Sequence, residues 1–190
     1  ERGVPIREQP VRGEPLLANY QFLTAKPLLL LFNVGEEALA DLPNLEGELC
    51  QRYQRPGVGV AALCAKLEAE LSQLSPEEEQ EFRQSLGLKG GHLERVVRLS
   101  LELLEQVCFF TGGPKEVRAW TITRGTPAVK AAGRIHSDME RGFIRAEVVT
   151  YSDLMAAGSM AEARRRGVLR MEGKGYQVQD GDVITFLFNV

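Results

Sequence analysis

One short segment of the chain carries side chains that could recognise a ligand. Asn33-Val34-Gly35-Glu36 follows a continuous apolar run, Leu28 to Phe32, which is typical of a strand buried on both faces in a parallel sheet. Open α/β sheets place ligand-contacting loops at the carboxyl ends of such strands. A plainer interpretation is a polar turn in which Asn33 caps a helix that starts at Glu36. Taken alone, the residues favour this plainer interpretation.

Cysteine and histidine chemistry has little support in the sequence. The three cysteines, Cys50, Cys64 and Cys108, lack any C-x-x-C spacing, so neither a disulfide framework nor a zinc site is predicted. Cys64 ends an apolar run and is expected to be a small buried residue, not a nucleophile. His136 and Asp138 could form an acid/base pair, but a helix-end histidine hydrogen-bonded within its own domain is the favoured alternative.

The predicted elements around these segments follow the order of an α/β sheet. Strands are expected at 28–32 and 58–64, and helices at 36–53, 66–74, 76–86 and 92–104. Ser75 and Glu78 are spaced as a capping box, with Pro76 in the first turn, and Gly87 can end the helix. A further short helix is expected from Leu16 to about Thr24.

After residue 111 the pattern changes to that of a small mixed sheet with helices on one side. Strands are predicted at 117–123, 144–150 and 183–190, with another starting at Tyr176 and a turn at 180–182. Short helices fit residues 151–157 and 159–166. The two halves of the chain therefore belong to different architectures.

Charge divides the chain in the same way. Of 190 residues with net charge −3, residues 1–106 hold 11 Lys and Arg against 17 Asp and Glu, and residues 107–190 hold 12 against 9. An acidic half followed by a basic half indicates two units, the second facing an anionic partner, although ordinary surface variation would also give this difference. No signal peptide or membrane span is visible, so a cytoplasmic protein is expected, and the first residue, Glu1, suggests that an N-terminal part is missing.

Several sequence blocks together carry a resemblance. The chain closely resembles the YchF family, the Obg-like ATPases, and the blocks occur in the family's order. They are LTAKP at 23–27, NVGE at 33–36, CAKLEAEL at 64–71, TGGPKEVRAW at 111–120, AAGRIH at 131–136, ERGFIRAE at 140–147, EGKGY at 172–176 and DGDVITFLFNV at 180–190. Many blocks in fixed order are specific where any one alone would be weak.

The resemblance implies a fold class and a domain plan. The fold is α/β, with the C-terminal part of a P-loop NTPase G domain followed by a β-grasp, ubiquitin-like TGS domain. Residues 1–24 would be the tail of a helical, coiled-coil insertion. Residues 25–106 would be the end of the G domain with its base-recognition loops, and residues 107–190 the TGS domain.

The resemblance also assigns a nucleotide-base site. GTPases read guanine with N-K-x-D, whereas the family has N-x-x-E, here Asn33, Val34 and Glu36, and prefers ATP while GTP remains possible. Cys64, Ala65 and Lys66 stand where GTPases have an S-A-[KL] loop that touches the base through its backbone amides.

One part of the family's machinery is absent from this sequence. A P-loop needs G-x-x-x-x-G-K-[ST], and the nearest glycine cluster, at 87–91, has the wrong spacing and order. The ligands of Mg²⁺ and the catalytic residues are therefore expected outside these 190 residues. The chain alone is expected to be inactive, as part of a longer ATPase or GTPase.

The resulting functional hypothesis is a nucleoside-triphosphate hydrolase that associates with ribosomes or other RNA of the translation machinery, with no DNA or membrane partner. The alternative is a non-enzymatic RNA- or protein-binding adaptor that uses its TGS domain. Basic residues of the second half are candidate RNA or ribosome contacts, or else a solvated helix face. They are Arg141, Arg145, Arg164, Arg165, Arg166, Arg170 and Lys174.

Overall fold

The computed structural model describes residues 3–86, 91–113 and 116–189 and divides into two compact units, 1–104 and 105–190. The predicted helix end at Gly87 and most of the glycine cluster at 87–91 lie outside these described ranges. Within them, no helix has the length and apolar character needed to cross a membrane.

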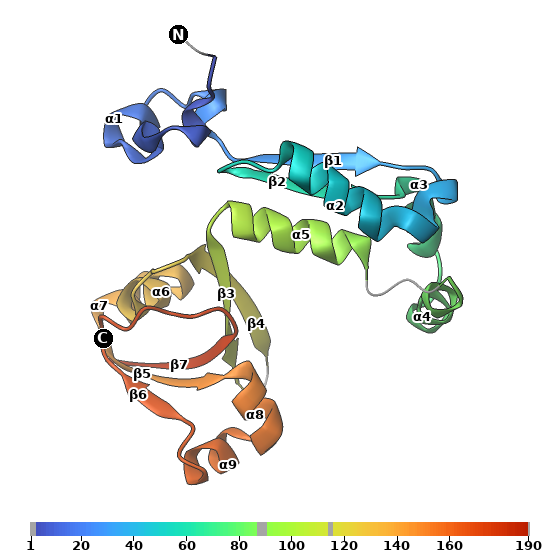
Figure 1. The fold of residues 1–190 in the computed structure, drawn as a ribbon. Coiled ribbons are helices and arrows are strands. Elements are labelled where there is room, and N and C mark those ends of the chain that lie inside the picture. Colours follow the sequence, from blue (N-terminus) through green and yellow to red (C-terminus); the bar gives the residue numbers. More distant parts are fainter. Residues whose placement is uncertain (1–2, 87–90, 114–115, 190) are drawn as a thin grey trace. The chain divides into compact units, whose positions relative to one another are not determined.

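The first unit is built on two parallel strands, β1 (Leu28–Asn33) and β2 (Val58–Leu63), paired residue for residue along their whole length. All six residues of β2 are buried, whereas Leu28 and Leu31 of β1 are exposed. Helices α2 (Leu42–Tyr53) and α5 (His92–Leu103) both contact β2 (Figure 1). The two strands predicted from apolar runs are confirmed, because a strand covered by helices on both faces needs no polar alternation.

The remaining elements of this unit are short. Ser75 and Glu78 form the predicted capping box at the start of α4. The helix predicted up to Thr24 is wrong beyond its first turn, because Gln21 adopts a positive φ of 51° that a helix cannot accommodate. The elements are the 3₁₀ helices Ile6–Glu8, Pro10–Gly13, Leu23–Ala25 and Glu36–Asp41, and helices α1 (Pro15–Ala18), α3 (Ala65–Leu71) and α4 (Pro76–Ser85).

A buried carboxylate joins three elements of the first unit. Glu46 on α2 is buried and accepts a hydrogen bond from the backbone N–H of Ala62 in β2, at 3.2 Å. The guanidinium of Arg95 on α5 forms an ion pair with the other oxygen of the same carboxylate. Burying a carboxylate is costly unless it is paired and hydrogen-bonded, and both conditions are met here.

The second unit contains a five-stranded mixed sheet in the order β4-β3-β7-β5-β6. Strand β3 runs antiparallel to β4 and parallel to β7, and β5 runs antiparallel to both β7 and β6. With a helix against one face, this order is that of a β-grasp fold (Figure 1). The strands are β3 (Gln106–Gly112), β4 (Val117–Thr123), β5 (Phe143–Thr150), β6 (Arg170–Glu172) and β7 (Asp182–Phe188).

Helices cover the two faces of this sheet unequally. On one face the alanines of α6 (Ala128–Ile135) pack against Phe109, Phe143 and Phe186, and Phe109 is fully buried with its ring edge-on to Phe186 at 6.0 Å. On the other face, α8 (Tyr151–Ala157) and α9 (Met160–Arg165) pack on Val149 and Val183. Helix α7 (Ser137–Arg141) follows α6 directly.

Two predictions for the second half need correction. Helices pack on both faces of the sheet, α6 on one and α8 and α9 on the other, and not on one side only. No strand begins at Tyr176, because the phenol of Tyr176 and the backbone N–H of Gln179 both bond to Asp182 and hold the segment as a loop. Helix α6 was not predicted, since its buried residues are alanines and not large apolar side chains. The turn at 180–182 is confirmed, with Gly181 at a φ of 81° that favours glycine.

We expect Phe109→Ala to lower the free energy of unfolding of the second unit by about 3–5 kcal/mol, the usual cost of emptying a fully buried aromatic site. Urea denaturation followed by the fluorescence of Trp120, the only tryptophan and a neighbour of this core, measures it. The control Thr121→Ala removes an exposed side chain and should change the value by less than about 0.5 kcal/mol. Equal losses for the two variants would contradict the assigned core.

Candidate functional site

The loops that follow β1 and β2 meet at one edge of the first unit. The backbone N–H of Val34 donates to the carbonyl of Leu63 at 2.9 Å, which continues the pairing beyond the strands. The side-chain oxygen of Asn33 accepts a hydrogen bond from the backbone N–H of Ala65 at 3.0 Å. Asn33 therefore does not cap the helical turn that starts at Glu36, and the plainer interpretation of this residue is wrong.

An ion pair makes a second bridge between the same loops. The ammonium of Lys66 lies 2.8 Å from a carboxylate oxygen of Glu36, and this contact raises the pKa of Lys66. The two side chains are 71% and 51% exposed, so the pair is well solvated and contributes little to stability. Glu36 can therefore exchange this partner for another hydrogen-bond donor at low cost.

One side of these loops is packed against apolar side chains of α3 and is shielded from solvent. The thiol of Cys64 is buried, and Cys64 packs with Leu67 and Leu71 of α3, against which Val34 and Leu39 also lie. Cys64 and Val34 thus pack on the apolar side of the loops and do not present a reactive group. The six candidate base-site residues, Asn33, Val34, Glu36, Cys64, Ala65 and Lys66, are brought together by the structure.

Within the described residues, no group of three or more His, Cys, Asp and Glu side chains is arranged to hold a metal ion. His136 caps α7, since its ring nitrogen accepts from the N–H of Asp138 at 3.1 Å. The helix-end interpretation of this histidine is thereby confirmed.

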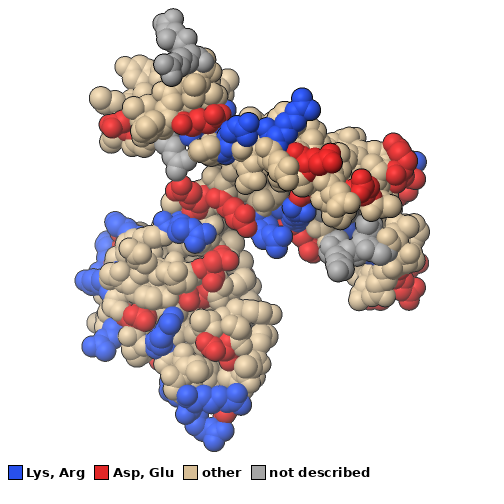
Figure 2. Space-filling view, viewed as in Figure 1, with Lys and Arg blue, Asp and Glu red and all other residues tan. Residues whose placement is uncertain are grey.

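Most of the candidate cations of the second unit already have acidic partners. Arg141 pairs with Asp138 and Arg164 with Glu147, while Arg165 and Arg166 both bond to Glu162 and lower its pKa to about 2. Figure 2 shows Lys and Arg gathered around α9, at the bottom of the view. Over the ranges 105–113 and 116–189, Arg145 and Lys174 have no such side-chain partner.

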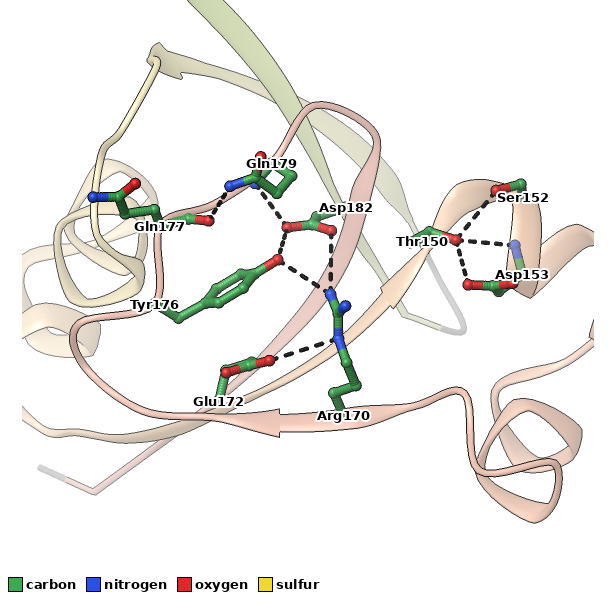
Figure 3. Close-up of polar contacts among 9 residues, drawn as sticks. All are labelled: Thr150, Ser152, Asp153, Arg170, Glu172, Tyr176, Gln177, Gln179 and Asp182. Atoms are coloured by element: carbon green, nitrogen blue, oxygen red, sulfur yellow. Dashed lines mark hydrogen bonds and ion pairs between the residues drawn. The ribbon is translucent and has the colours of Figure 1, made fainter.

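Arg170 takes part in a polar network that the sequence did not reveal (Figure 3). Its guanidinium lies over the ring of Tyr176 and donates to the phenol oxygen at 3.2 Å. The phenol donates in turn to the buried carboxylate of Asp182 at 2.7 Å, which also accepts from the N–H of Gln179 at 2.8 Å. Burial and the bond to Asp182 raise the pKa of Tyr176 to about 12.

Comparison with known proteins identifies the family. Residues 106–189 match the model YchF-GTPase_C, described as "Protein of unknown function (DUF933)". The chain is 46% identical over 179 residues to "Ribosome-binding ATPase YchF" of Bacillus subtilis (strain 168), covering 93% of this chain and 49% of that protein. The chain belongs to the YchF family. The YchF protein of Haemophilus influenzae is 44% identical over 174 residues, covering 92% of this chain and 48% of that protein.

Solved structures agree with the fold. The Schizosaccharomyces pombe YchF GTPase superposes with a TM-score of 0.77 at 30% identity, over 90% of this chain and 46% of that one. A GTP binding protein from Pyrococcus horikoshii OT3 gives a TM-score of 0.58 at 16% identity, over 87% of this chain and 47% of that one, which shows a shared fold. The chain thus spans about half the length of the curated YchF relatives that it matches.

Tyr176 should keep its phenol proton to about pH 12, and ultraviolet absorbance of tyrosinate measures this. An unfolded tyrosine loses its proton near pH 10, whereas Tyr176 in the folded chain keeps it to about pH 12. Its contribution to stability is therefore complete below pH 10 and is lost between pH 10 and about 12.

Tyr176→Phe should remove the ionisation step near pH 12. The control Tyr151→Phe, which removes an exposed tyrosine, should leave that step in place. An ionisation step near pH 12 that survives Tyr176→Phe would show that the network does not hold the phenol proton.

Proposed function

We propose that this chain is the base-recognition segment and TGS domain of a YchF-type ATPase that binds ribosomes. The observation that carries the proposal is the bond between Asn33 and the N–H of Ala65, since it joins two ligand-contacting loops at the carboxyl ends of parallel strands. The names of the B. subtilis and H. influenzae relatives support the ATPase activity and the ribosome as partner.

In this proposal the chain has three parts. Residues 1–24 are the tail of a helical insertion, residues 25–106 the end of the G domain, and residues 107–190 the TGS domain. The unpaired edge of β1 supports the assignment of residues 25–106 to the end of the G domain. Among the described residues β1 pairs only with β2, and its Leu28 and Leu31 are exposed. A parallel sheet normally continues until its apolar residues are covered, so a further strand belongs at this edge.

The base is read by the edge that carries Asn33 and Glu36. A glutamate is one methylene longer than the aspartate of the guanine-reading motif, so the guanine contact is displaced and ATP is preferred over GTP. Glu36 accepts from the base amino group after releasing Lys66, because that ion pair is exposed and weak. The phosphates and Mg²⁺ are held by residues outside this chain, in the part that carries the P-loop.

In the longer protein that carries this chain, Glu36→Asp should weaken ATP binding by about 1–3 kcal/mol, the scale of a charged hydrogen bond. Titration with fluorescent ATP and GTP measures the effect. Glu37→Asp is a matched control, because it shortens the adjacent carboxylate in the same helical turn and should leave the nucleotide preference unchanged.

An unchanged nucleotide preference in Glu36→Asp would mean that Glu36 does not read the base. If Asn33→Ala were also without effect, the adaptor alternative would be favoured over the ATPase.

The 190-residue chain by itself should release no phosphate from ATP above background, and it should bind nucleotide weakly, because phosphate contacts supply much of the affinity for a nucleotide. A phosphate-release assay on the purified chain, beside the longer protein as the positive control, measures this. Turnover by the chain at the rate of the longer protein would contradict the assignment of the phosphate site to other residues.

A further inference from the structure

One end of the β5–β7 pair presents side chains away from the core. Ala146 and Phe186 lie opposite each other and belong to the core, so the next pair, Arg145 and Leu187, points to the opposite face. A bulge between residues 143 and 145 places Ile144 beside Arg145, opposite Leu187.

Helices α8 and α9 cover only the other end of this face, through Val149 and Val183. Where they stop, three apolar side chains stay open: Ile144 is 54% exposed, Met171 47% and Leu187 37%. Met171 lies opposite Glu147, one row along from Arg145. We call Ile144, Arg145, Met171 and Leu187 the open-face patch.

The charge of this patch is available for a partner. Arg145 is exposed and forms no ion pair or side-chain hydrogen bond with any residue in 105–113 or 116–189, unlike the arginines at positions 164–166. The one carboxylate on the same rows, Glu147, is already paired with Arg164 at 2.6 Å. A free guanidinium therefore lies beside three exposed apolar side chains, a combination that favours an apolar contact flanked by a carboxylate.

We propose that the open-face patch docks a protein surface that presents an apolar side chain next to a carboxylate. The choice of partner rests on the proposed function: in a protein that binds ribosomes, the partner is an acidic face of a ribosomal protein. Ribosomal RNA fits less well, because the patch has no aromatic ring on which a base could stack. The arginines at positions 164–166 would have to leave Glu162 and Glu147 before they could bind phosphate.

Co-sedimentation of the full 190-residue chain with purified bacterial ribosomes tests the proposal. We expect Arg145→Glu to lower the affinity about 10-fold or more, as for a desolvated charged contact. Arg124→Glu is the matched control, since Arg124 is also exposed, has no side-chain partner within the described ranges, and lies in the turn after β4; it should change the affinity less than about 2-fold. Thermal melting verifies that both variants fold.

A photo-crosslinking amino acid, p-benzoylphenylalanine, placed at position 187 identifies the chemical class of the partner. The adduct formed on ribosomes should be degraded by protease and resist ribonuclease. The same amino acid at position 155, an exposed methionine site on α8 outside the patch, should give no such adduct.

The possible failures differ in what they reject. If the unmodified chain does not sediment with ribosomes, both ribosome binding and the docking patch are rejected. If it sediments but Arg145→Glu and Arg124→Glu weaken binding equally, or the adduct contains RNA, only the docking patch is wrong and the RNA alternative stands.

Discussion

The parallel pairing of β1 with β2 is the constraint on which the candidate site depends. Parallel strands end at the same edge of a sheet, so residues 32 positions apart in sequence are brought within hydrogen-bond reach, and Asn33 joins the two loops through the N–H of Ala65. The buried thiol of Cys64 and the side chain of Val34 support that edge from the apolar side. The polar side chains are thereby positioned on a rigid base, although each is exposed.

In the second unit, the net positive charge counted from the sequence is larger than the positive charge that is free to attract an anion. Residues 107–190 carry a net +3, yet most of the arginines that produce it bond to Glu147, Glu162, Asp138 or the network of Asp182. These pairs neutralise the surface locally, so a count of charges overstates the attraction for phosphate. On the described part of the sheet that α8 and α9 leave uncovered, Arg145 lies beside exposed aliphatic side chains.

Local signals in the sequence predicted local structure well. The apolar runs of β1 and β2 and the capping box of Ser75 depend on neighbours in sequence, and all three formed. Helix α6 escaped prediction because its core residues are small, and their burial depends on phenylalanines from distant strands. The bond of Asn33 and the network of Tyr176 were likewise hidden, because each partner comes from another loop. The candidate base-site residues were assigned through the family resemblance, and their contacts with one another are seen only in the structure.

The carboxylate of Glu46 has a consequence for how the first unit opens. It serves α2, β2 and α5 at once, so α5 cannot detach without leaving a buried negative charge that has lost its counter-ion. Separating α5 from α2 and β2 therefore costs more free energy than the loss of apolar packing alone. The amide of Ala62 should exchange with solvent only when all three elements separate together, which makes them one cooperative unit.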